Sequence, residues 1–170
     1  MAIPNPQSDS DLLALLALLA LPFQAQAIIK KGQPAPQIKV VTTSGQRVTL
    51  ANYKGHVLVM DFFATWCPPC RESIPYLIDL NRQYGKQGLQ ILGLSVDGGS
   101  DKVVKEFIAG EGINYPVAMA NDDIQADYGL SSVPMILVID KKGIVAERYL
   151  GISENIEKSM ETLIRKLLSE

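Results

Sequence analysis

Hydrophobic and polar positions after Gly32 follow two alternating patterns, apolar runs of strand length and apolar residues at helical spacing. Continuous apolar runs indicate buried strands, and spacings of three and four indicate helices that cover them. The expected strands span residues 38–42, 47–50, 56–63, 89–96, 115–119, 135–140 and 144–150, and the expected helices span residues 68–86, 102–109, 122–128 and 154–168. This order predicts an α/β domain with a mixed central sheet flanked by helices. The first two strands predict a hairpin around Ser44-Gly45.

The first 27 residues follow a different pattern. Leu12 to Leu21 is an unbroken run of Leu and Ala, and Ala25-Gln26-Ala27 matches the small-x-small site of a signal peptidase. The run has about ten residues, short of the ~20 that span a bilayer as a helix. Its upstream flank carries Asp9 and Asp11 instead of the basic residues of an ordinary signal. We expect a signal-peptide-like leader over residues 1–27 and one domain over residues 28–170. The protein is then periplasmic or otherwise exported, either released by cleavage or tethered by an uncleaved leader.

Composition excludes several classes of partner. The chain has 16 Lys and Arg against 18 Asp and Glu, so a nucleic-acid partner held by electrostatics is not expected. Its two cysteines and one histidine are too few for a structural zinc site, and we expect neither a metal nor a cofactor. We expect a monomer.

The two cysteines, Cys67 and Cys70, form one C-x-x-C where a buried strand gives way to a helix. Unpaired N–H groups and the helix dipole favour an anion at that point, so Cys67 is expected to be the nucleophilic thiolate. Cys70 lies one turn further along the helix and deeper, where it can resolve a mixed disulfide formed at Cys67. The alternative, two unrelated core thiols, requires the only two cysteines to have met at this spacing by chance.

Several motifs together resemble the thioredoxin superfamily. They are Thr65-Trp66-Cys67-x-Pro69-Cys70 after an apolar strand, Ser132-Val133-Pro134 before a later strand, the Gly32-x-Pro34-x-Pro36 lead-in, and an extra strand and helix within residues 89–130. The resemblance is to the exported proteins of the TlpA, ResA and DsbE type. It implies a thioredoxin fold with an N-terminal β-hairpin and a central strand-helix insertion. It also implies that the protein is an enzyme of thiol-disulfide exchange.

The resemblance assigns further site residues. Trp66 matches the tryptophan beside the nucleophile, and Gly151 matches a glycine of the substrate groove. Pro134 matches a cis-proline that faces the disulfide, where the backbone of Val133 pairs with an extended substrate. Asp61, six residues before Cys67, matches a buried aspartate. Burial raises a carboxyl pKa and suits a proton acceptor for Cys70, whereas a strand-end aspartate that reaches water would have no such role.

Two residues near the cysteines favour one direction of electron flow, from this protein to its substrate. Pro68 removes one N–H that could stabilise the Cys67 thiolate, and together with Asp61 this favours a reductant. The resemblance implies electrons from a membrane thiol donor of the DsbD or CcdA type. They pass to disulfides of exported proteins, with apocytochrome c as one candidate.

Two other functions remain as alternatives. A peroxiredoxin-like peroxidase needs a Thr-x-x-Cys, whereas Ala64 stands three residues before Cys67. A non-catalytic module that binds through the thioredoxin groove is disfavoured because both cysteines are present.

Overall fold

The computed structural model describes residues 29–170, and the predicted leader at residues 1–27 lies outside them. The strands are β1 (Lys39–Val41), β2 (Arg47–Thr49), β3 (Val57–Phe63), β4 (Leu89–Ser95), β5 (Val117–Met119), β6 (Met135–Ile139) and β7 (Val145–Leu150). The α-helices are α2 (Pro68–Tyr84), α3 (Lys102–Glu111), α4 (Asp122–Asp127) and α5 (Glu154–Ser169), and the 3₁₀ helices are η1 (Leu50–Tyr53) and η2 (Gly85–Gln87). These elements confirm the predicted α/β fold.

The central sheet is mixed and has the strand order β5-β4-β3-β6-β7. Strand β3 runs parallel to β4 and antiparallel to β6, and β4 runs parallel to β5. All seven residues of β3 are buried, as expected for a central strand covered on both faces. In this register Asp61 lies opposite Gly93 on one side and Ile136 on the other.

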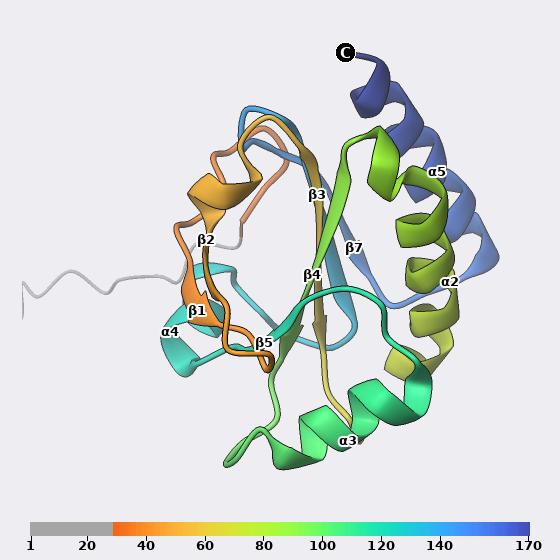
Figure 1. The fold of residues 1–170 in the computed structure, drawn as a ribbon. Coiled ribbons are helices and arrows are strands. Elements are labelled where there is room, and N and C mark those ends of the chain that lie inside the picture. The colour runs from red at the N-terminus through yellow and green to blue at the C-terminus, as the bar shows by residue number, and fades with distance from the viewer. Residues whose placement is uncertain (1–28) are drawn as a thin grey trace, which may run out of the picture.

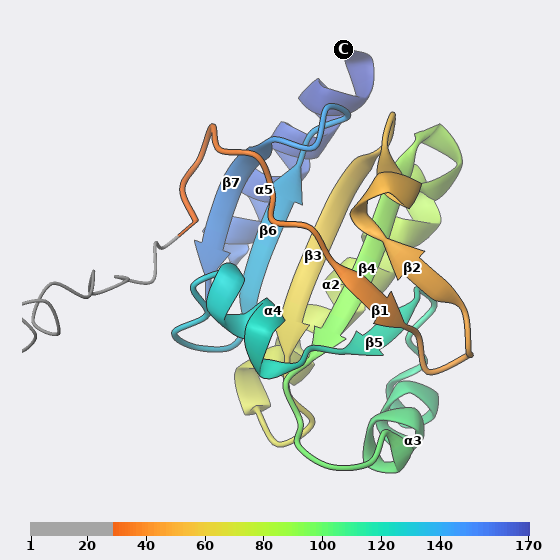
Figure 2. The same cartoon turned by 90° about the vertical axis from the view of Figure 1, so that its left-hand side faces the viewer.

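Different elements cover the two faces of the sheet (Figures 1 and 2). Helices α2, α3 and α5 pack on one face, where α5 contributes the buried Met160, Ile164 and Leu167. The β1-β2 hairpin and α4 pack on the other face, through Val40, Val48 and Ile124 among others. The hairpin and the strand-helix insertion therefore stand where the sequence places them.

Element boundaries differ from the prediction mainly at short elements. The strand expected over residues 115–119 begins at Val117, and the two 3₁₀ helices were not predicted. Helix α2 continues through Pro75. Within residues 29–170, no helix combines the length and the apolar character needed to cross a membrane.

Candidate active site

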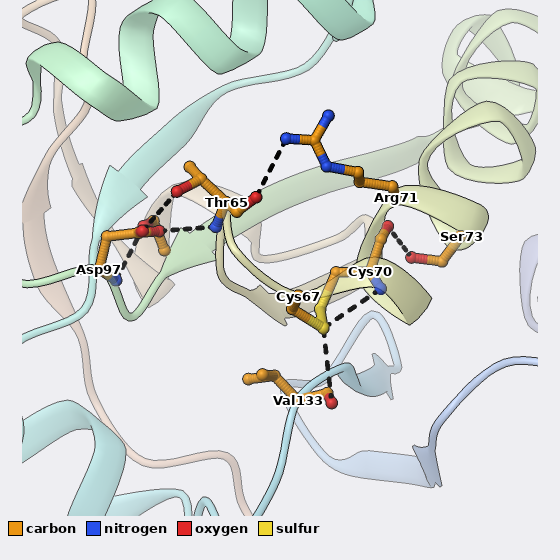
Figure 3. Close-up of a disulfide and its surroundings, with 8 residues drawn as sticks. Thr65, Cys67, Cys70, Arg71, Ser73, Asp97 and Val133 are labelled. Carbon is orange, nitrogen blue, oxygen red and sulfur yellow. Dashed lines mark hydrogen bonds between the residues drawn. A yellow bond between two sulfur atoms is a disulfide. The ribbon is translucent and has the colours of Figure 1, made fainter.

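The centre of the site is a disulfide between Cys67 and Cys70 at the start of α2 (Figure 3). Cys67 is the N-cap residue, with extended backbone, and Pro68 begins the helix because its fixed φ suits that position. The backbone N–H of Cys70 donates a hydrogen bond to the Sγ of Cys67 over 3.3 Å. Cys67 retains 4% exposure and Cys70 has none, so Cys67 is the sulfur nearer to solvent.

The loop before β6 faces this disulfide. The Val133–Pro134 peptide bond is cis, as the motif predicts. The carbonyl oxygen of Val133 lies 3.7 Å from the Sγ of Cys67 (Figure 3). On the other side of the loop, the N–H of Gly151 donates to the carbonyl oxygen of Pro134 over 2.9 Å. Trp66, beside Cys67 in the chain, is 69% exposed. Cys67 and the Val133–Pro134 bond thus lie together, and Gly151 is hydrogen-bonded to Pro134.

Asp61 lies in the middle of β3 and is completely buried. Alternation along the strand places its side chain with those of Val59 and Phe63, on the face where Cys70 is also buried. Neither carboxyl oxygen has a hydrogen-bond partner within residues 29–170. Burial raises the pKa of Asp61 to about 7. The alternative of a strand-end aspartate that reaches water is wrong.

Asp97, two residues after the end of β4, holds the segment that leads into Cys67, and the sequence analysis did not predict this role. Its carboxylate accepts from the N–H of Thr65 (2.9 Å), from the hydroxyl of Thr65 (2.6 Å) and from the hydroxyl of Ser95 (2.7 Å). Figure 3 shows Asp97 and Thr65 together with the disulfide. The sequence signal that could have indicated it was an acidic residue directly after the apolar run at residues 89–96.

Arg71 makes a second connection to the same segment, from the residue after Cys70. Its guanidinium donates to the carbonyl oxygen of Thr65 over 3.2 Å and to the carboxylate of Glu111 over 2.6 Å. It also lies 4.7 Å from the ring centroid of Phe107, within the range of a cation–π contact. Helix α3 is therefore linked to the active-site loop. The sequence carried no signal for this contact, because it depends on how α3 packs.

We predict that Asp97→Ala lowers the free energy of unfolding of the oxidised protein by about 2 kcal/mol, because buried donors lose a charged acceptor. Urea unfolding measures the change. The matched control is Asp101→Ala, which removes only a surface ion pair with Lys105 and should cost under about 1 kcal/mol. Equal losses in the two variants would mean that the Thr65–Asp97 bonds do not stabilise the fold.

No group of three or more His, Cys, Asp or Glu side chains that could hold a metal ion occurs within residues 29–170. The reactive group that the structure does present is the disulfide. A dithiol at a helix N-terminus, faced by a cis-proline loop on a mixed sheet, is the arrangement of a thioredoxin-fold redox protein.

Comparisons with known proteins agree with this class. The Redoxin family pattern matches residues 30–164. Thiol-disulfide oxidoreductase ResA of Bacillus thuringiensis is 32% identical over 137 residues, covering 80% of this chain and 78% of the relative. Thioredoxin-like protein YneN of Bacillus subtilis is 31% identical over 124 residues, covering 72% and 73%. A solved thiol:disulfide interchange protein of the thioredoxin family from Chlorobium tepidum superposes with a TM-score of 0.71 at 30% identity, covering 84% of this chain and 99% of that one.

The chain belongs to the Redoxin family, and its fold is the thioredoxin fold. It is a thiol-disulfide oxidoreductase of the ResA and DsbE type.

Proposed function

We propose that this oxidoreductase works as a reductant of disulfides in exported proteins, with Cys67 as the attacking thiol and Cys70 as the resolving thiol. The observation that carries the direction is the first turn of α2. Pro68 and Pro69 occupy its first two positions, so only the N–H of Cys70 reaches the Cys67 sulfur. The nearby cation of Arg71 is paired with Glu111. A thiolate with so little stabilisation favours the disulfide form, which makes the dithiol reducing.

The proposed reaction moves two electrons in two exchange steps. The Cys67 thiolate attacks one sulfur of a substrate disulfide, which forms a mixed disulfide and releases the other substrate sulfur as a thiolate that takes a proton from solvent. Asp61 then takes the proton of the Cys70 thiol, and the Cys70 thiolate attacks the Cys67 sulfur. This step releases the second substrate thiol and leaves Cys67 and Cys70 oxidised. The raised pKa of Asp61, about 7, makes its carboxylate a suitable base near neutral pH.

The loop before β6, which contains Val133 and Pro134, suggests how protein substrates bind. The Val133 carbonyl lies beside the Cys67 sulfur, and Trp66, which precedes Cys67 in the chain, is exposed. We assign Trp66, Val133, Pro134 and Gly151 to a substrate groove in which the backbone of an extended chain pairs beside the reacting sulfur. Backbone pairing is tolerant of substrate sequence, which suits a reductant that serves several proteins, apocytochrome c among them.

The predicted leader supports the proposal that the protein is exported and receives its electrons from a membrane protein. An exported dithiol is regenerated by a donor that carries electrons across the membrane, and a membrane thiol protein of the DsbD or CcdA type fits that need. We place the boundary between leader and domain near residue 28. Ile29 is already buried in the core, and the N–H of Gly32 bonds to the carbonyl oxygen of Val145.

We predict a reduction potential close to the about −270 mV of thioredoxin, far from the about −120 mV of the strongest oxidants of this fold. Equilibration in glutathione or dithiothreitol buffers measures it, with the emission of Trp66, the only tryptophan, as the signal. Pro69→Ala restores an N–H at the second helical position, where N-cap acceptors are bonded, so it should raise the potential. Pro68→Ala is the matched control and should raise it less. A wild-type potential near that of the oxidants would refute the proposed direction.

A further inference from the structure

Two buried polar groups on the face of the sheet that α2 covers lack hydrogen-bond partners within residues 29–170. One is the carboxyl of Asp61, and the other is the hydroxyl of Tyr115, which precedes β5. Buried polar groups in folded proteins are nearly always paired. Both side chains belong to the face of the sheet that α2 covers, since Tyr115 packs in the same cluster as Cys70. Two such groups on one face call for a common explanation.

Gly93 explains how the Tyr115 ring comes close to Asp61. It is the β4 residue directly opposite Asp61, on a strand about 4.8 Å away. A Cβ on Gly93 would lie 3.4 Å from Cε2 of Tyr115, and closer still to Val117 and Phe63. Val117, Phe63 and the Tyr115 ring therefore border the space that a side chain at position 93 would fill. The Tyr115 hydroxyl is two bonds from Cε2 and lies within range of the Asp61 charge, since burial and this charge both raise the pKa of Tyr115.

We propose that the Tyr115 hydroxyl is the donor that stabilises the ionised carboxylate of Asp61, which makes Tyr115 a positioning residue for the proton transfer with Cys70. The inference rests on the proposed role of Asp61 as the proton acceptor. A rotation of the Asp61 side chain, or one bridging water, completes the hydrogen bond.

The electrostatics of this face agree with a specific pair. Burial raises the pKa of Tyr115 well above its ordinary value, and the charge of Asp61 raises it further, so Tyr115 stays a neutral donor. Several other titratable or charged side chains on the elements packed against this face form separate groups. They are Cys67 and Cys70 in the disulfide, Tyr76 and Tyr84 with Glu157, Glu161 and Tyr149, and Arg71 with Glu111.

The test is Tyr115→Phe, which removes the hydroxyl and keeps the ring. Loss of a donor to the carboxylate should raise the pKa of Asp61 by about one unit. Carboxyl-carbon NMR titration of the oxidised protein measures this shift directly, with Asp61→Asn used to assign the signal. The acidic limb of the pH profile of the resolving step should move to higher pH by the same amount. A purely structural role of Tyr115 would not cause this shift.

The matched control is Tyr128→Phe, at another buried tyrosine, which packs on the opposite face of the sheet and whose hydroxyl donates to the Pro36 carbonyl oxygen. It should leave the Asp61 titration unchanged. In an Asp61→Asn background, Tyr115→Phe should cause no further change in the pH profile. An Asp61 titration in Tyr115→Phe that matches the wild type overturns the inference. A pH profile that Asp61→Asn leaves unchanged instead refutes the proposed proton acceptor, while the NMR titration still decides the Tyr115 contact.

Discussion

Cys67→Ser is expected to abolish disulfide exchange, whereas Cys70→Ser is expected to complete the first step and stop at a stable mixed disulfide. The two sulfurs differ in their surroundings, since Cys67 keeps some exposure and Cys70 has none. Only Cys67 lies beside the Val133 carbonyl, where an incoming chain would pair. A serine at position 67 cannot form the mixed disulfide, so the rate falls to that of the uncatalysed background. A serine at position 70 removes only the resolving attack.

A single-turnover assay with a disulfide-bonded protein substrate measures both outcomes. Reduced Cys70→Ser should release one substrate thiol per molecule and gain the mass of the substrate chain, and dithiothreitol should reverse the adduct. Reduced Cys67→Ser should release no thiol and gain no mass. Adducts of equal yield on both variants would show that either cysteine attacks, and the assignment of roles would be wrong.

The fold could be predicted from the sequence because its signals are local. The apolar run at residues 57–63 is a strand buried on both faces, so its length and pattern define it without knowledge of its neighbours. The C-x-x-C lies at the junction of that strand with α2. The junction by itself predicted Cys67 at the N-terminus of the helix and Cys70 one turn deeper.

The rest of the site depends on register and packing, which local pattern does not encode. Gly93 is one more residue of an apolar strand until the pairing sets it opposite Asp61. Tyr115 was expected to start a strand, but Pro116 follows it and has no N–H for a sheet ladder. The Pro116 carbonyl instead accepts from the N–H of Gly93 over 2.9 Å, and the Tyr115 side chain turns into the core.

Contacts between elements far apart in the chain were missed for the same reason. Asp97 bonds to Thr65 across 32 positions, and Arg71 bonds to Glu111 across 40. Asp97 holds the segment between β3 and the disulfide through its carboxylate, which accepts from Thr65. Arg71 holds the same segment and links it to Glu111 of α3. The cysteines can be found from the sequence alone, whereas the residues that fix their geometry require the assembled sheet.

Asp61→Asn is expected to change how the stability of the oxidised protein depends on pH. Burial gives Asp61 a pKa of about 7 in the folded state, against an ordinary value of 3.8. The folded state therefore binds the proton more tightly than the unfolded state does. The stability contributed by the protonated carboxyl is fully present below about pH 4, and it is lost as the pH rises toward 7. This loss is at most about 4 kcal/mol, a large part of the 5–15 kcal/mol of an ordinary domain.

Urea unfolding at several pH values between 4.5 and 8, with the disulfide intact, measures the effect. The stability of Asp61→Asn minus that of the wild type should rise over this interval by about 2 to 4 kcal/mol. The difference isolates Asp61, because the cost of an unpaired Asn amide does not vary with pH and the other titrating groups occur in both proteins. Asp79→Asn, a change at an exposed side chain of α2, should give a flat difference. A flat difference for Asp61→Asn as well would mean that Asp61 titrates alike in the folded and unfolded states, and a carboxyl of that kind has no raised pKa with which to serve Cys70.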